Sequence, residues 1–496
     1  MYNPYPSFRP GQKEAITEIL DAFKSGNRVI ELNAPTASGK SLILYILGMH
    51  LKQHGRVIYT TPQVALVDQL DGFEGMPVLK GKRNYKCDFF NMTATECPFM
   101  SWKEATEACI QKHGSTSPCV HCEYRKKQRE FSNSSFGATT FARYMIDHEL
   151  RSSTSILLID ESAGLERALI ERSAMAIPEE VDLSNLKESM KIHISEQTKR
   201  KKKLMENMAE IKYRAIRGDD KAILDLADVM TQTRRIEREI LKGTKVIGHI
   251  ENDDAFHVSS ERKFRLLEGK TEFNRMIASN VLTVLASGTP TTKLISDNFH
   301  TIRVQHPITV DRRRVIYVPV GKMNMREREK NAGAVAKAIS KLHEKKTIVH
   351  CGSYVIADLI YKNMPRNLIK QTILQTRTTR EEAKNKFLRA KGPKIFLSVN
   401  FEEGLDLAGS DYPVNIIAKV PFENLGDEYI RQRNAFDGEQ RYKINAAVKI
   451  QQAAGRCTRS PEDFSTTYIL DGSFAWFFQA NSKFFESWFR ASLEFV

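Results

Sequence analysis

Long uncharged apolar runs are missing from this sequence. No stretch of about 18 apolar residues without charge occurs, and an α-helix needs roughly that length to cross a bilayer. The first residues, MYNPYPSFRPGQKEAI, also contain no apolar core like that of a secretory signal peptide. We therefore expect a soluble, cytoplasmic protein without a membrane partner.

Cysteine is scarce, and it is unevenly placed. The chain has 7 cysteines, an odd number that argues against a disulfide framework in a large protein of a reducing compartment. Cys351 and Cys457 stand apart and are expected to pack in cores. The other five lie between residues 84 and 124, in a pattern that favours metal ligands, and are Cys87, Cys97, Cys109, Cys119 and Cys122.

The chain is too long for one ordinary hydrophobic core. Its 496 residues predict two to four units at roughly 100 to 200 residues per domain. The 75 Lys+Arg exceed the 60 Asp+Glu, which gives a formal net charge of +15. This excess favours a polyanionic partner, nucleic acid before a membrane surface.

A nucleotide-binding loop is indicated near the N-terminus. The stretch NRVIELNAPTASGKSLILYILGMHLKQHG predicts a strand, a turn of small residues and an amphipathic helix ending near Gly55. Its centre fits the Walker A form, in which backbone N–H groups surround a phosphate, Lys40 reaches the β/γ oxygens and Ser41 holds Mg²⁺. The residues expected to bind the nucleotide are Ala34, Pro35, Thr36, Ala37, Ser38, Gly39, Lys40 and Ser41.

A later strand, SILLIDESA, ends in the carboxylates Asp160 and Glu161. This arrangement is typical of Walker B, in which Asp160 would bind Mg²⁺ through water and Glu161 would polarise the attacking water. With the phosphate loop, it predicts Mg²⁺-dependent ATP hydrolysis in a parallel α/β sheet, with Ser41 and Asp160 at the metal.

The C-terminal region supplies cations. The stretch IQQAAGRCTRSPEDF places Gln452, Arg456 and Arg459 at spacings that can project from one face of a helix. Such cations can stabilise the charge that develops during phosphoryl transfer, so all three are catalytic candidates. Together with FEEGLDLAG, at residues 401–409, they point to a two-lobed motor with ATP in the cleft.

The ordered set of motifs resembles the superfamily 2 helicases. It comprises FRPGQ, APTASGKS, TTPQVALVDQL, IDESA, ASGTP, FEEGLDLAG and QAAGRCTR. The cysteine stretch after LKGKRNYKC is similar to that of the iron–sulfur branch, the XPD/DinG family. The resemblance extends from Phe8 to about Asp471. It departs from the family's glycine-rich loop at Ala37 and Ser38.

The resemblance implies an ATP-dependent DNA helicase that travels 5′ to 3′ on single-stranded DNA. It further implies that Gln12 reads the adenine, that Asp406 contacts ATP or the ribose edge, and that Ser287 to Thr289 couple hydrolysis to DNA. Arg456 with Arg459 would contact the transferring phosphate.

The resemblance also implies two RecA-like P-loop domains, with an iron–sulfur cluster domain and a helical Arch domain inserted in the first. The Arch region reads as two or three long helices broken at RGDD. Its run from Lys199 to Lys203 fits either DNA contact or a solvated helix face. The expected boundaries are 1–83, 126–165 and 266–300 for the first motor domain, 84–125 for the cluster domain, 166–265 for the Arch and 301–496 for the second motor domain.

In this family the cysteine insert binds a [4Fe–4S] cluster through thiolates. Cys87 and Cys122 match the family's first and last ligands. Cys97, Cys109 and Cys119 compete for the two remaining positions, with Cys97 the least favoured. A zinc ion held by four of these thiols is the alternative.

We therefore expect a monomeric helicase that acts on single-stranded and forked DNA, uses ATP and Mg²⁺, and carries the cluster domain where strands separate. One alternative is a translocase that strips proteins from DNA without unwinding. Another is a nucleotide-gated nucleic-acid-binding adaptor with a zinc module. DNA-stimulated ATP turnover distinguishes a motor from an adaptor, and duplex unwinding distinguishes a helicase from a translocase.

Overall fold

The chain forms two compact units. Unit 1 comprises Met1–Tyr2, Leu44–Leu285 and Leu294–Asp297, and unit 2 comprises Asn3–Ile43, Ala286–Lys293 and Asn298–Val496. The computed structural model describes residues 7–87, 92–95, 97, 120–217, 219–289, 295, 299–399, 407, 411–458, 460 and 462–496.

The first sheet has seven strands in the order β12-β1-β11-β7-β2-β6-β3. The pairs β1–β12, β2–β6, β2–β7 and β3–β6 are all parallel. Every residue of β2, β6 and β7 is buried, as expected for a parallel sheet covered on both faces. The strands are β1 (Val29–Asn33), β2 (Val57–Thr61), β3 (Val78–Leu79), β6 (Phe136–Thr140), β7 (Ile156–Asp160), β11 (Leu282–Ser287) and β12 (His300–Arg303).

The helix that follows the phosphate loop, α2 (Lys40–Leu51), is buried on nearly every side. The sequence predicted an amphipathic helix ending near Gly55, which is wrong in both respects. Apolar residues fill almost every position of KSLILYILGMHL, so no polar stripe exists to face water. At Gly48 a Cβ atom would lie 2.3 Å from the Phe136 ring, so only glycine allows this approach of α2 to β6.

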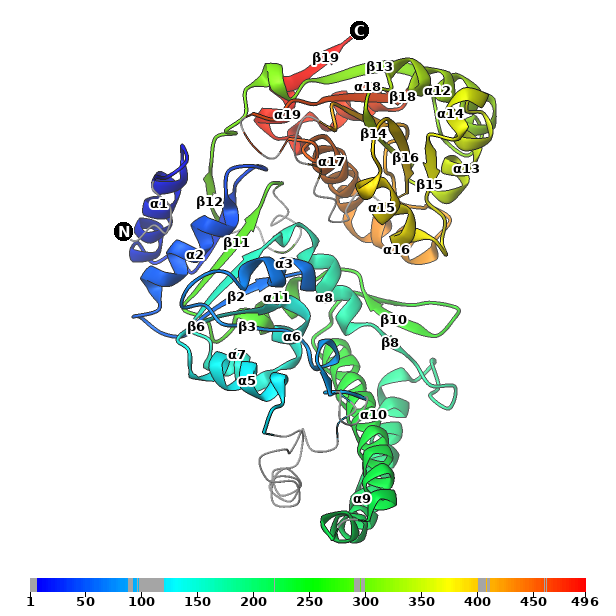
Figure 1. Cartoon of the computed structure of the whole chain (residues 1–496). Helices are drawn as coiled ribbons and strands as arrows, with labels where there is room; N and C mark the ends of the chain where they lie inside the picture. The colour runs from blue at the N-terminus through cyan, green and yellow to red at the C-terminus, as the bar shows by residue number, and fades with distance from the viewer. Residues whose placement is uncertain are drawn as a thin grey trace. The chain divides into compact units, whose positions relative to one another are not determined.

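Two long helices, α9 (Leu186–Ile216) and α10 (Asp220–Glu251), lie side by side as a hairpin (Figure 1). The break between them falls at RGDD, as the sequence predicted. The Asp219 carboxylate accepts a hydrogen bond from the Ala222 N–H at 3.1 Å and caps the start of α10. A small antiparallel sheet adjoins the hairpin, with β8 (Met175–Ala176), β9 (Phe256–Val258) and β10 (Lys263–Leu266).

The second sheet also has seven strands, in the order β15-β16-β14-β17-β18-β13-β19, and all its described pairs are parallel. Successive residues alternate between its faces. Ile416 therefore packs in one core and Ile417 in the other. The strands are β13 (Val315–Gly321), β14 (Lys346–His350), β15 (Thr372–Leu374), β16 (Lys394–Ser398), β17 (Val414–Ile417), β18 (Thr466–Asp471) and β19 (Leu493–Phe495).

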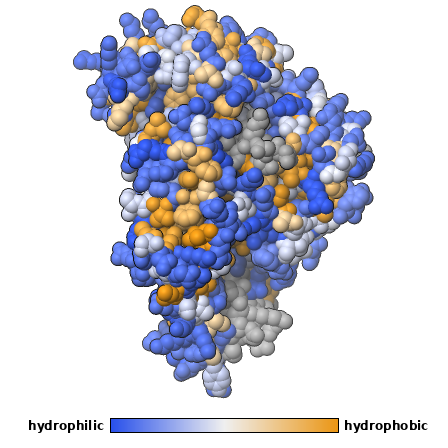
Figure 2. Space-filling model, turned by 180° about the vertical axis from the view of Figure 1, so that it is seen from behind, coloured by the Kyte–Doolittle hydropathy of each residue, from blue (hydrophilic) through white to orange (hydrophobic). Residues whose placement is uncertain are grey.

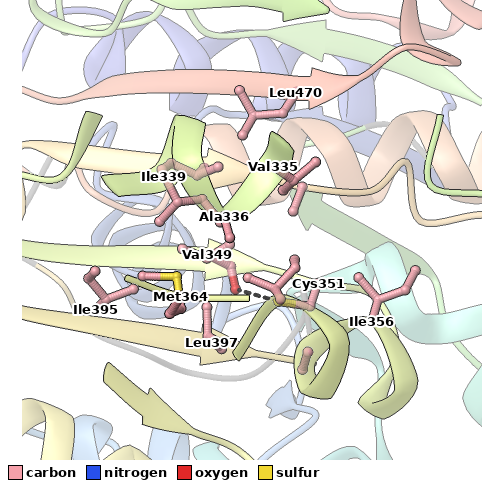
Figure 3. Packing of buried hydrophobic residues seen from close by; sticks show 14 of the residues in the cluster. Val335, Ala336, Ile339, Val349, Cys351, Ile356, Met364, Ile395, Leu397 and Leu470 are labelled. Carbon is pink, nitrogen blue, oxygen red and sulfur yellow. Dashed lines mark hydrogen bonds between the residues drawn. The ribbon is translucent and has the colours of Figure 1, made fainter. Parts of the chain in front are cut away.

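One face of this sheet packs against α12 (Arg328–Leu342) and α13 (Tyr354–Lys362), in the core that Figure 3 shows around Val335, Val349 and Cys351. The other face packs against α17 (Gln440–Ala454), α18 (Phe474–Asn481) and α19 (Ser487–Ser492). The C-terminal aromatics Phe474, Phe477, Phe485 and Phe489 belong to this second core. Two parallel-sheet α/β domains of the RecA type are thus confirmed.

The remaining described α-helices and strands are α1 (Gln12–Lys24), α3 (Val64–Leu70), β4 (Lys86–Cys87), β5 (Met92–Thr93), α5 (Glu123–Asn133), α6 (Phe141–Ile146), α7 (His148–Ser153), α8 (Leu165–Ser173), α11 (Lys270–Ile277), α14 (Arg366–Ile369), α15 (Arg380–Arg389) and α16 (Glu428–Asp437).

No helix of the described ranges is long and apolar enough to span a membrane. On the face seen in Figure 2, hydrophilic residues cover much of the surface and hydrophobic residues form separate groups.

Candidate active site

The phosphate loop connects β1 to the first residue of α2, Lys40. Ser38 folds the loop back on itself, because its N–H and hydroxyl both donate to the Pro35 carbonyl, at 3.2 and 2.7 Å. Ala37 and Gly39 adopt left-handed backbone angles, with φ of 69° and 76°. For alanine this conformation is strained, at a cost of roughly 1–3 kcal/mol.

The N-terminal FRPGQ segment holds the loop in this strained shape. Arg9 donates to the Ala37 carbonyl at 2.8 Å, and the Gln12 amide nitrogen donates to the Ser38 carbonyl at 2.9 Å. Gln12 is 1% exposed, and its amide oxygen accepts the Arg9 N–H. The expected contact between Gln12 and adenine stays a prediction. The structure shows that Gln12 supports the loop.

The Ser287 to Thr289 segment lies against the same loop. The Ala34 N–H donates to the Ser287 carbonyl at 2.9 Å. A Cβ atom on Gly288 would lie 3.6 Å from the Ala34 oxygen and 3.8 Å from the Lys40 ammonium. A shift of this segment would therefore displace the groups around Lys40.

The segment that carries Arg456 also reaches the loop, because a Cβ atom on Gly455 would lie 3.2 Å from the Thr36 hydroxyl. The sequence placed Gln452, Arg456 and Arg459 on one helix face, and this prediction is wrong for Arg456. Helix α17 ends at Ala454 with Gly455 as its cap. Arg456 follows the helix and is 9% exposed.

Asp160 closes β7 in unit 1 and is 6% exposed. The Tyr59 phenol donates to one carboxylate oxygen at 2.6 Å, and the Glu161 N–H donates to the other at 2.9 Å. These two bonds fix the orientation of the carboxylate. Glu161 has a left-handed φ of 52°, a kind of strain that gathers at functional sites.

Sequence reasoning missed Tyr59 and His306. Tyr59 lies on the strand beside β7, and an aromatic residue in VIYTT looks like ordinary core. His306 lies 5.3 Å from Trp488 between ring centroids. Burial, followed by the charges of Arg313 and Lys40, lowers the pKa of His306 to about 3. A neutral imidazole therefore lies within the electrostatic reach of Lys40, and no sequence signal indicates it.

Several predicted residues lie outside the described residues: Asp406, Arg459, Cys109 and Cys119. Among the described cysteines, Cys97 is buried, whereas Cys87 in β4 and Cys122 at the start of α5 are partly exposed. Within the described ranges, no three His, Cys, Asp or Glu side chains are grouped as metal ligands.

Two helicase domain models match parts of this chain. A DEAD/DEAH box helicase model matches residues 9–72 and a helicase C-terminal domain model matches residues 336–492. The structure of S. tokodaii Xpd4 is similar over 98% of this chain and 99% of its own, with a TM-score of 0.54 and 15% identity. The chain thus contains regions that match helicase domain models, and it shares the fold of the Xpd4 structure.

A structure of S. cerevisiae Dbp5 bound to RNA and ADP BeF3 is less similar to this chain. It covers 99% of this chain and 93% of its own, with a TM-score of 0.42 and 9% identity. No curated protein matches the sequence.

Replacing Lys40 by alanine should abolish ATP hydrolysis, because it removes the loop's cation from the β/γ-phosphates. Loss of one such stabilising group costs at least about 100-fold in turnover, measurable as phosphate release. Lys24→Ala serves as the matched control, because Lys24 is a solvent-exposed lysine at the end of α1, with a side chain 75% exposed. Near wild-type turnover in Lys40→Ala would contradict the site.

Proposed function

We propose that this chain is a helicase that couples Mg²⁺-dependent ATP hydrolysis to 5′-to-3′ movement on single-stranded DNA. One observation carries the proposal: Gln12, Gly288 and Gly455, from three motifs far apart in sequence, all lie against the phosphate loop. Because all three segments contact the same loop, they can shift together when ATP bound to that loop is hydrolysed.

In this proposal the loop backbone from Ala34 to Gly39 surrounds the phosphates, while Lys40 binds the β/γ oxygens. Glu161 accepts a proton from the attacking water. A buried carboxylate and a hydroxyl, from Asp160 and Ser41, suit Mg²⁺, which prefers oxygen ligands. When bound, this ion neutralises charge on the phosphates. Base and ribose contacts are assigned to Gln12 and Asp406, and stabilisation of the transferring phosphate to Gln452, Arg456 and Arg459.

The proposed domain boundaries are those expected from the family resemblance. The cluster domain comprises 84–125 and the Arch 166–265, both inserted into a first motor domain formed by 1–83, 126–165 and 266–300. The second motor domain is 301–496. We further propose that the protein acts as a monomer on single-stranded and forked DNA.

Helix α10 offers a surface for the nucleic-acid backbone. Arg234, Arg238, Lys242 and Lys245 follow one another at spacings of three or four residues, so they share one helix face. We call these four residues the α10 basic face. From Arg234 to Lys245 it extends over about 16 Å, at roughly 1.5 Å per residue.

Further cations gather at both ends of the α10 basic face. Burial, then the charges of Arg234 and Arg143, lower the pKa of Lys82. Burial, then the charges of Arg172 and Arg238, lower the pKa of Lys242. Crowded, partly buried cations repel one another, and a polyanion bound here would relieve that repulsion.

The lysine run on α9 suits this role less well, because it lacks the neighbouring cations that surround the α10 basic face. Each surface has one paired lysine: Lys201 bonds to Glu237 and Lys245 to Glu272, both at 2.8 Å. The other four residues of the run are exposed, as in an ordinary solvated helix face. We therefore assign the DNA backbone to the α10 basic face.

Combining Arg238→Gln with Lys242→Gln should weaken binding of single-stranded DNA and flatten its salt dependence. Each lost phosphate contact on a single strand makes the negative slope of log K against log salt shallower by about 0.7. Loss of two contacts should therefore make it shallower by about 1.4. Fluorescence anisotropy at several salt concentrations measures this slope. The matched control is Arg235→Gln, since Arg235 is 83% exposed and pairs with Glu239. Equal slopes for the double variant and the control would rule out this face.

We also propose that four of Cys87, Cys97, Cys109, Cys119 and Cys122 bind a [4Fe–4S] cluster, with a zinc ion as the alternative. The described cysteines fit such a site in one respect. Cys87 and Cys122 are partly exposed thiols on elements joined by the packing of Tyr85 and Tyr124, whose ring centroids lie 5.3 Å apart. Thiolates suit either metal.

Cys122→Ser should remove or destabilise the metal and reduce strand separation far more than nucleotide binding, because the insert lies outside the phosphate loop. Iron and zinc content of an anaerobic preparation, with its visible absorbance, gives the metal directly. Cys351→Ser is the control, because Cys351 packs in the core of the second sheet and not in the cysteine insert. Stoichiometric zinc without iron in the wild-type protein would support the zinc alternative.

The proposed polarity is tested with overhang substrates. A duplex with a 5′ single-stranded overhang should be unwound with ATP and Mg²⁺, whereas a matching 3′ overhang should be poor. Added salt should slow the reaction, because phosphate contacts weaken. Efficient unwinding from the 3′ overhang alone would refute the polarity, and ATP-dependent movement without unwinding would indicate a translocase.

A further inference from the structure

Three buried polar residues lie on neighbouring strands of the second sheet, close to the C-terminal end of α17. His350 ends β14, Asn415 lies in β17 and Thr467 lies in β18; His350 and Asn415 are fully buried and Thr467 is 1% exposed. Asn415 is in register with Ile348 on one side and Thr467 on the other. Because residues two apart share a face, His350, Asn415 and Thr467 all lie on the α17 side of the sheet.

Asn415 is bonded directly to the last turn of α17. Its amide nitrogen donates to the Ala453 carbonyl at 2.8 Å and to the Thr467 hydroxyl oxygen at 3.1 Å. The Thr467 hydroxyl donates to the Ala454 carbonyl at 3.4 Å. The last carbonyls of a helix have no partner within it, so these strand side chains satisfy groups that the helix leaves open.

The Ala453 carbonyl also accepts the backbone N–H of Arg456, at 3.2 Å. One carbonyl thus joins the sheet, through Asn415, to the backbone of Arg456. Arg456 follows α17, and its N–H bond to Ala453 continues the last turn of the helix. Asn415 bonds to the same carbonyl, so its contact contributes to the position of Arg456.

His350 lies close enough to Arg456 to feel its charge. Burial first, and then the Arg456 guanidinium, lower the pKa of His350 to about 3, with Asn415 acting in the opposite direction. The imidazole is therefore neutral at physiological pH. It therefore adds no second positive charge to that of Arg456.

We infer that Asn415 is a positioning residue for Arg456, and that His350 supports it from the neighbouring strand. The inference rests on the proposed function, in which Arg456 stabilises the charge of the transferring phosphate. Polar side chains buried at this depth cost free energy unless their bonds are made. Their role here is to hold the chain that presents the guanidinium.

The inference predicts an effect on turnover rather than on ATP binding, because a misplaced cation loses contact mainly with charge that develops in the transition state. Asn415→Leu keeps the approximate volume and removes the bonds to Ala453 and Thr467. It should lower kcat for DNA-stimulated ATP hydrolysis about 10-fold or more, with KM for ATP changed less than about 2-fold.

The deciding experiment is a double-mutant cycle with Arg456→Ala. If Asn415 acts through Arg456, Asn415→Leu should lower kcat in the wild-type background and cause no further loss in Arg456→Ala. Cys351→Ala is the control, because Cys351 is fully buried next to His350 but packs in the core on the opposite face. It should lower the thermal midpoint and leave kcat unchanged.

Two milder variants test the positioning role in case Asn415→Leu fails to fold. Thr467→Val removes one acceptor of the Asn415 amide and the bond to Ala454, and should show a smaller loss of kcat with the same dependence on Arg456. His350→Gln retains a neutral polar group and should keep more activity than His350→Leu.

Equal fold losses from Asn415→Leu in both backgrounds would overturn the positioning role, and so would a raised KM with unchanged kcat. Failure of the proposed function looks different. Wild-type protein would then show no DNA-stimulated ATP hydrolysis, or Arg456→Ala would keep the wild-type rate, and either result would overturn the positioning role as well.

Discussion

The strained phosphate loop is the constraint on which the candidate site depends. Ala37 holds a left-handed backbone angle that glycine adopts without strain. The loop keeps this angle because Arg9 and Gln12 bond to its carbonyls from a separate segment. Their bonds offset the strain, so the N-terminal segment is part of the candidate site through its contacts with the loop.

The site is also built from groups that are held in place by neighbours. Tyr59 orients Asp160, Ser287 bonds to the loop, and Asn415 bonds to the helix end before Arg456. Each of these neighbours lies on a strand of one of the two parallel sheets. Rigid strands thus supply the support, whereas the groups assigned to ATP lie at strand ends and in the loops that follow them, as is usual in parallel α/β folds.

The sequence predicted much of this arrangement because its signals are local. The strand, turn and helix around Lys40, the strand before Asp160 and the helix break near Asp219 each depend on a short run of residues. The contacts of Tyr59, His306 and Asn415 depend on which strands become neighbours, and no local pattern records that. The error at Arg456 had another cause: a spacing of four residues puts two side chains on one face only where the helix continues, and α17 ends at Ala454.

Because α17 ends before Arg456, substitutions on the helix surface and substitutions in the neighbouring strands should affect this arginine differently. Exposed side chains of this helix take no part in the bonds that join Arg456 to Ala453 and Ala453 to Asn415, so they can be replaced without breaking those bonds. Replacement of a strand residue such as Asn415 disturbs the arginine directly. In homologous chains, the drift of surface residues on α17 should therefore be independent of the buried positions in β17 and β18, which would change only together with Arg456.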